Sequence, residues 1–291
     1  MADKVGVFDR LGYAGSGITT ATHEFEFLEG STLGLAENFI DTNGLRGTRS
    51  HGSERVRRGT RRVDGQLLLA PTPVELAVLL PLVFGGTPSG NSYPLGESLT
   101  LFNLFGVRDG TVYTYSDCVV ASATFSASEG GPMQLALTLI GKDEAASGSR
   151  GTAAIDLTTQ PFVLHDAVVS VAGSNREVSS FSLTVENTVE AKFRNSATIT
   201  QLKATDRTVS VDLPISLGTD GALYGSALGG VAVTITLTNG ATSLAFSMTK
   251  VQAPKQPLPL GQRTIIDLPW RGVARKDGAT LELTTTLDAT P

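Results

Sequence analysis

The chain has 291 residues and a formal net charge of −5, and charged residues make up only 18% of it. This length is enough for one large domain or two of ordinary size. The slight acidity excludes a general electrostatic attraction to nucleic acid or acidic membranes. The only cysteine, Cys118, excludes an internal disulfide framework and fits folding in a reducing cytoplasm.

Residues 1–22 are rich in Gly and Thr and show little periodicity, so we expect an irregular N-terminal arm. The first residues lack a positively charged region followed by an apolar run, and no cleaved signal peptide is predicted. The most apolar segment, 74–84, has about half the length that a bilayer-spanning helix needs. The sequence therefore predicts a soluble protein.

Strand-like sequence begins at His23, and Thr, Ser and Val recur along the chain, as in pleated strands joined by tight turns. Asn-Gly and Asp-Gly tolerate the positive φ angles of two-residue hairpin turns. They predict turns at 43–44, 64–65, 109–110, 220–221, 239–240 and 277–278. The clearest hairpin joins 231–237 to 243–248, because its first strand alternates apolar and polar residues.

Arginines gather in the run 43–62, which is predicted to be a long loop. Its charged residues are Arg46, Arg49, Glu54, Arg55, Arg57, Arg58, Arg61 and Arg62. One interpretation is a contact with nucleic acid, because arginine pairs with phosphates, but no aromatic residue is interleaved for base stacking. A solvated, mobile loop is a second interpretation. We favour a third, a protein–protein contact with acidic surfaces on a neighbouring subunit, because the rest of the chain is net acidic.

One helix is predicted in each half of the chain. Around 72–80, Thr72 is a suitable N-cap, Pro73 occupies the first helical position and Glu75 lies in the first turn. Pro81 should end or kink this helix, and we expect it to lie across the open face of a β-sandwich. The counterpart predicted in the second half, around 220–228, is shorter and has a weaker helix pattern.

The chain contains an internal repeat. Residues 23–29 and then 61–69 in the first half match 180–187 and then 206–213 in the second, and each half continues to a Gly-Gly pair. From Asp109 to Gly141 is 32 residues and from Asn239 to Gly272 is 33, by subtraction of positions. Differences in connection length are expected in a repeated fold, because loops tolerate insertions.

The composition of the middle of the chain sets the domain boundaries. Residues 143–159 are small, polar and Gly/Ser-bearing, which is typical of a linker. We therefore expect an N-terminal arm at 1–22, a first module at 23–142 and a second module at 160–291. A duplicated β module without obvious chemistry indicates an architectural role.

No catalytic pattern is evident in the sequence. The three histidines, His23, His51 and His165, are far apart, and none has metal-ligand spacing with Cys118. There is no nucleophile elbow, phosphate loop or dinucleotide fingerprint. Cys118 stands in an apolar stretch and is expected to pack as a small hydrophobic residue. We expect neither enzymatic activity, nor a bound metal, nor a cofactor.

Segments 45–47 and 58–65 in the first half, and 162–167, 178–187 and 206–209 in the second, resemble the major tail tube proteins of long-tailed, siphovirus-like bacteriophages. The resemblance covers about residues 23–285. It implies a mainly β protein with two tandem tail-tube-type β-sandwich modules, each with a flanking helix. Both modules would contribute strands to a β-barrel ring.

The resemblance also implies a function. Stacked rings would form the tail tube through which DNA leaves the virion, and the arginine-rich run 43–62 occupies the position of a loop that reaches the adjacent ring. Most single-module relatives form hexameric rings, so the resemblance implies trimeric, pseudo-hexameric rings for a chain with two modules, with a hexamer as the alternative.

The implied partners are further copies of the chain, the tape measure protein and DNA in the lumen without sequence-specific binding, and the tail terminator and distal tail proteins. No membrane is involved. The protein would be assembled in the bacterial host cytoplasm and end in the virion tail.

A DNA conduit should not grip its cargo. We therefore expect a neutral or negative lumen and arginines that face other subunits, an expectation that Arg55, Arg57 and Arg58 lining the channel would contradict. A β-sandwich module for host binding or adhesion at the tail tip is the alternative function.

Overall fold

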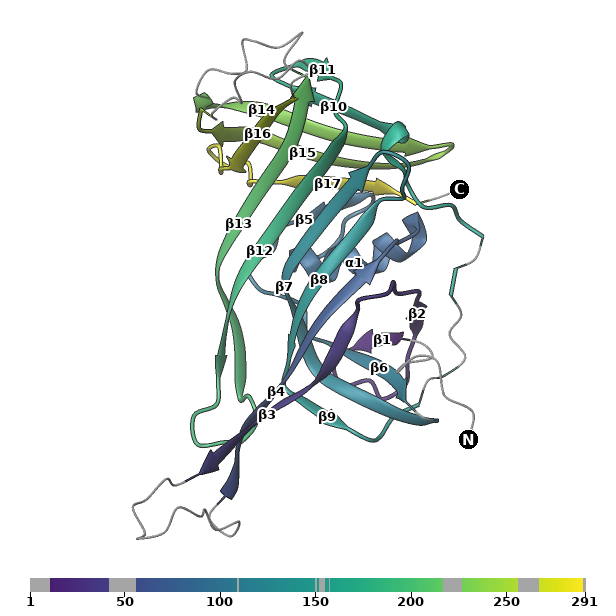
Figure 1. Cartoon of the computed structure of the whole chain (residues 1–291), viewed down its shortest axis with the longest axis vertical. Coiled ribbons are helices and arrows are strands. Elements are labelled where there is room, and N and C mark those ends of the chain that lie inside the picture. The colour runs from purple at the N-terminus through teal and green to yellow at the C-terminus, as the bar shows by residue number, and fades with distance from the viewer. Residues whose placement is uncertain are drawn as a thin grey trace.

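The described part of the chain is mainly β, with 17 strands and one α-helix (Figure 1). The computed structural model describes residues 11–41, 56–108, 110–149, 151, 155–156, 158–216, 227–255 and 267–289. The predicted mainly β fold class is confirmed. No helix within these ranges is both long and apolar enough to cross a membrane.

A long antiparallel sheet dominates the fold. Its strands run in the order β3, β4, β8, β7, β12, β13 and β16. In the same order they span Thr32–Asp41, Val56–Leu69, Gln134–Gly141, Thr111–Ser128, Ser180–Lys192, Gln201–Ser216 and Asp267–Ala274. One face of this sheet carries the core, because buried apolar residues alternate with polar ones along β7, β8 and β12.

Beyond β16 the sheet continues into a second group of strands. These are β15 (Thr242–Ala253), β14 (Ala227–Asn239), β10 (Ala167–Val171), β11 (Ser174–Arg176), β17 (Thr284–Asp288) and β5 (Ser92–Pro94). Strands β14 and β15 form the predicted hairpin, and Gly240 occupies its turn with a φ of 62°. That prediction is confirmed.

A smaller sheet lies beside the first. It consists of β1 (Leu11–Gly15), β2 (His23–Phe25), β6 (Phe102–Arg108), β9 (Asp143–Ala145) and the first part of β7. The expectation of an irregular segment is therefore wrong for residues 11–15. Leu11 and Ala14 are buried. Gly12 permits the close packing, because a Cβ at this position would lie 2.7 Å from the Cβ of Ala21.

Strand β7 passes from one sheet to the other through a corner at Asp117. The residue has a φ of 49°, and the pairing register with β6 shifts next to it. Its backbone N–H donates to Asn103 Oδ1 at 2.9 Å, and its carboxylate accepts from Ser16 at 2.5 Å and Lys142 at 2.9 Å. Aspartate tolerates the left-handed conformation, and these contacts hold the corner in place.

The predicted first helix is confirmed as α1 (Pro73–Phe84). Thr72 caps it, and Thr72 and Glu75 form a reciprocal capping box. Pro81 does not end the helix, which continues to Phe84. It ends at Gly85, which has a φ of 73° and donates its N–H to the carbonyl of Pro81. The second predicted helix lies almost wholly outside the described residues, since 217–226 are not described.

One predicted turn is wrong. Asp64 and Gly65 lie inside β4, opposite Ile140 and Leu139 of β8. Gly65 serves close approach rather than chain reversal, because a Cβ there would lie 2.7 Å from Leu33 Cδ1. Gly110 and Gly278 do have positive φ angles, as turn residues should, whereas 43–44 and 220–221 lie outside the described residues.

The alignment of the internal repeat also needs correction. Residues 23–25 form β2, which pairs with β1, so they do not occupy the position of β12. By its pairing, strand β3 corresponds to β12. Strand β3 forms a hairpin with β4, which pairs with β8, and β12 forms a hairpin with β13, which pairs with β16. Short alternating strands resemble one another in sequence, and residue similarity alone could not choose between them.

Candidate functional site

Strands β3 and β4 extend past the body of the molecule as a protruding hairpin, formed by residues 37–41 and 56–62 (Figure 1). The outer part of its described residues exposes three large apolar side chains, Phe39, Ile40 and Val56, with exposed fractions of 61%, 54% and 43%. Isolated exposed apolar residues are normal, but a cluster on a protrusion is typical of an interaction surface.

Four of the eight charged residues of the arginine-rich run, Arg57, Arg58, Arg61 and Arg62, can be placed on this hairpin. Its residues 56–62 belong to strand β4, so the expectation of a loop extending to residue 62 is wrong. Val56, Thr60 and Val63 are β-branched, and cross-strand pairing with β3 fixes the extended conformation. Arg46, Arg49, Glu54 and Arg55 lie outside the described residues.

Three of the described arginines of this run have acidic partners within the chain. Arg58 lies 3.6 Å from Glu37, Arg61 2.8 Å from Asp143 and Arg62 2.9 Å from Asp64. Arg57 and Arg58 are exposed towards the end of the hairpin, whereas Arg61 is half-buried at its base. Arg61 is therefore an anchor of the hairpin, whereas Arg57, Arg58 and Arg62 face solvent.

The two halves of the chain are joined edge to edge by β7 and β12. Seven residue pairs, from Ser180↔Ser128 to Glu186↔Ser122, connect the strands in one antiparallel ladder. Across it, the hydroxyl oxygens of Thr124 and Thr184 lie 3.0 Å apart. On the opposite face, the rings of Phe125 in β7 and Phe246 in β15 pack at 5.0 Å. The ladder makes one continuous wall from the two halves.

The face of this wall opposite the core is rich in hydroxyl groups. Three cross-strand rows over β8, β7, β12, β13 and β16 contain the polar residues Thr138, Ser122, Glu186, Thr208, Thr124, Thr184, Ser210, Gln134, Ser126, Ser182, Asp212 and Arg271. Asp212 and Arg271 form an ion pair at 2.7 Å. Because Glu186 is the remaining charge in these rows, this hydroxyl-rich face is close to neutral.

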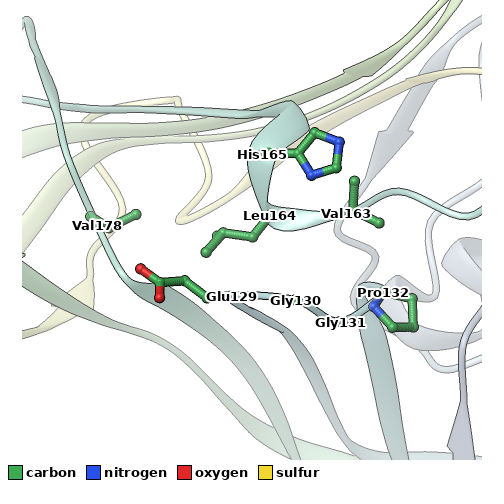
Figure 2. A pocket seen from close by; sticks show the side chains of 8 residues that line it. All are labelled: Glu129, Gly130, Gly131, Pro132, Val163, Leu164, His165 and Val178. Carbon is green, nitrogen blue, oxygen red and sulfur yellow. The ribbon is translucent and has the colours of Figure 1, made fainter.

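A groove with a volume of about 560 Å³ opens at the turn between β7 and β8. It lies between the turn residues 129–132 and the segment that contains Val163, Leu164, His165 and Val178. In Figure 2, Leu164 points into the space between Val178 and Glu129, while the ring of His165 points away from it.

The histidines and the cysteine of the sequence do not form a metal site within the described ranges. His23 and His165 lie in different parts of the fold, and no group of three or more potential metal ligands exists within the described ranges. His51 lies outside them. Cys118 is fully buried, and burial raises the pKa of its thiol. It packs as a small hydrophobic residue, as predicted.

Sequence reasoning missed both the hydroxyl-rich face and the apolar end of the hairpin. The face follows from strand register, and a slip of one residue would exchange it with the core face. The run of Thr and Ser at alternate positions in 180–188 was an available signal. Phe39 and Ile40 gave a weaker signal, because two adjacent apolar residues in a strand are equally compatible with burial.

Comparison with known proteins supplies an independent assignment. Residues 10–284 match the family described as phage tail tube protein. No curated protein matches the chain in a sequence search. The family match spans nearly the whole described structure, including both halves of the wall and the protruding hairpin. The chain therefore belongs to the phage tail tube protein family.

Proposed function

We propose that this tail tube protein assembles as stacked rings whose lumen conducts DNA out of the virion. Family membership makes it a structural protein of the phage tail. The observation that carries the proposal is the β7–β12 ladder, which joins two similar sets of strands into one wall. The chain would be assembled in the bacterial cytoplasm with the tape measure, tail terminator and distal tail proteins as partners.

The order of strands supports two modules per chain. The first half contributes β3-β4-β8-β7 and the second β12-β13-β16-β15, with the same pairings between neighbours. Gly141 faces Val63 in one set, and Gly272 faces Val211 in the other. We propose that 23–142 and 160–291 are equivalent modules linked by 143–159. The short strand β9 then belongs to the start of the linker.

Two equivalent modules per chain lead to a ring of three chains with pseudo-sixfold symmetry. The β7–β12 ladder within a chain would then imitate the junction between chains, and closing the ring would remove exposed sheet edges. Native mass spectrometry of isolated rings tests this stoichiometry. Three chains per ring are expected, and six chains per ring would refute the equivalence of the modules.

We assign the hydroxyl-rich face to the lumen. It offers DNA phosphates no excess of cationic groups, because Arg271 is paired with Asp212, whereas an added lysine or arginine without an acidic partner would bind phosphates and retard the DNA. Thr184→Lys should leave tubes visible by negative-stain microscopy and lower infection by phage that carry it. Thr184→Gln, a neutral change of similar length, is the control. Normal DNA delivery by the lysine variant would contradict the assignment.

A further inference from the structure

Two unexplained surfaces lie towards opposite ends of the molecule. The protruding hairpin is at one end of the long axis, and β7 and β8 meet towards the other, where the groove opens (Figure 1). The two surfaces of a single chain cannot meet. A contact between them must join different copies in a head-to-tail manner, and a contact of this type propagates a filament.

The two surfaces are chemically complementary. The described strands of the hairpin present Phe39, Ile40 and Val56, and the groove presents the apolar side chains of Pro132, Val163, Leu164 and Val178. Burying these side chains against one another would remove an exposed apolar cluster from water, which stabilises the contact in proportion to the apolar area that is buried.

The charged residues near the two surfaces are also opposite in sign. Ile40 and Phe39 are paired across the hairpin with Arg57 and Arg58, so each apolar residue has a cation opposite it. The exposed residue Glu129 lines the groove, and the exposed residue Glu177 precedes Val178 in the sequence. Opposite charges around an apolar contact select the partner and the orientation.

We propose that the groove receives the protruding hairpin of a second copy of this chain in the adjacent ring, with Ile40 or Phe39 against Leu164 and Arg57 near Glu129. The inference rests on the proposed stacking of rings and adds the receiving surface. Each copy offers one hairpin and one groove. Several weak contacts in parallel around a ring then give a stable junction.

Disulfide trapping in assembled tubes tests the contact. The chain with Ile40→Cys and Leu164→Cys should form intermolecular links on mild oxidation, and a ladder of oligomers should appear on denaturing gels. Cys118 is fully buried and does not compete. The control pair is Ile40→Cys with Leu228→Cys, because Leu228 is 72% exposed but lies on β14, outside the groove.

The outcomes distinguish a failure of the contact between hairpin and groove from a failure of the proposed tube assembly. Tubes with a ladder for the groove pair alone support the contact. Tubes with no ladder, or with equal ladders for both pairs, refute the contact and leave the proposed function standing. If the unsubstituted chain forms no tubes under any condition, the proposed function fails and the contact fails with it.

A second variant removes dependence on cysteine geometry. Leu164→Asp places a charge in the groove and should abolish tube growth while the fluorescence of Trp270 shows an intact fold. Val168→Asp places the same charge on an exposed valine of β10, outside the groove, and should not affect growth. Growth of normal tubes by Leu164→Asp would refute the contact.

Discussion

The packing of Phe125 against Phe246 should couple the two halves of the chain energetically. Phe125 lies in β7 and Phe246 in β15, both are fully buried, and their ring centroids are 5.0 Å apart with planes inclined at 50°. Tilted aromatic pairs contribute about 0.5–1.5 kcal/mol beyond their buried area. A double-mutant cycle on this pair should therefore show a coupling free energy of that size.

The substitutions must cost less free energy than the stability of the whole protein, so that all variants stay folded. Phe→Ala at a buried site costs about 3–5 kcal/mol, so two such changes approach the whole stability of about 5–15 kcal/mol that a native protein has. Phe→Leu keeps most of the volume and should cost about 1.5 kcal/mol per site. The cycle therefore consists of Phe125→Leu, Phe246→Leu and the double variant.

Chemical denaturation of the unassembled chain gives the four free energies of unfolding. Trp270 is the only tryptophan and is buried in β16, so its fluorescence reports unfolding of the second half. The control pairs Phe125→Leu with Phe105→Leu, because Phe105 belongs to a separate buried cluster. These changes should add to within about 0.3–0.5 kcal/mol. A coupling for Phe125 and Phe246 no larger than in the control would refute a shared core.

Three further predictions concern local features. Thr72→Ala removes the cap of α1 and should lower the free energy of unfolding by about 1 kcal/mol, whereas Thr72→Ser should not, as thermal denaturation will show. Cys118, whose thiol pKa is raised by burial, should react with thiol reagents only as fast as the protein unfolds; fast labelling of the native chain would contradict its burial. Burial acts to raise the pKa of Asp117, but hydrogen bonds from Ser16 and Lys142 outweigh it and the pKa is lowered. The ionised carboxylate therefore stabilises the fold above the unfolded pKa of about 3.9, and this stabilisation is lost as the pH falls through the folded pKa. Asp117→Asn should therefore reduce the fall in melting temperature that the protein shows on acidification. An unchanged fall in melting temperature would contradict this.

Features of the fold that depend on local chemistry could be predicted from the sequence. The cap at Thr72 and the turn at Gly240 require particular residue types, and both are where the sequence places them. Gly65 shows the limit of this reasoning, because the same dipeptide suits a turn or a close approach between strands. Only the pairing of β4 with β3 and β8 distinguishes these two uses.

The candidate surfaces depended on information that sequence pattern does not contain. The arginine run was recognisable by composition, but the internal partner of Arg61 is Asp143, 82 residues away along the chain. Contacts of this range follow from topology rather than from periodicity. For the same reason, the groove combines a turn at 129–132 with residues 163–165 that no local signal connects.

The two long hairpins of the wall differ in a way that bears on the stacking of rings. The loop that joins β12 to β13, residues 193–200, folds against the first half of the chain. There the carbonyl of Ala197 accepts a hydrogen bond of 2.8 Å from the N–H of Arg61, and Ile199 is buried. This contact covers the edge of β4 beyond Val63, where pairing with β8 ends.

The second hairpin is thus held against its own chain, while the first extends from it. If the modules are equivalent within the wall, a ring of three chains presents six similar hairpins, of which three protrude and three support them. Truncating 193–200 should then destabilise the protruding hairpin rather than remove a contact between rings. Hydrogen exchange would show this as loss of protection at Arg61, and unchanged protection there would refute the supporting role.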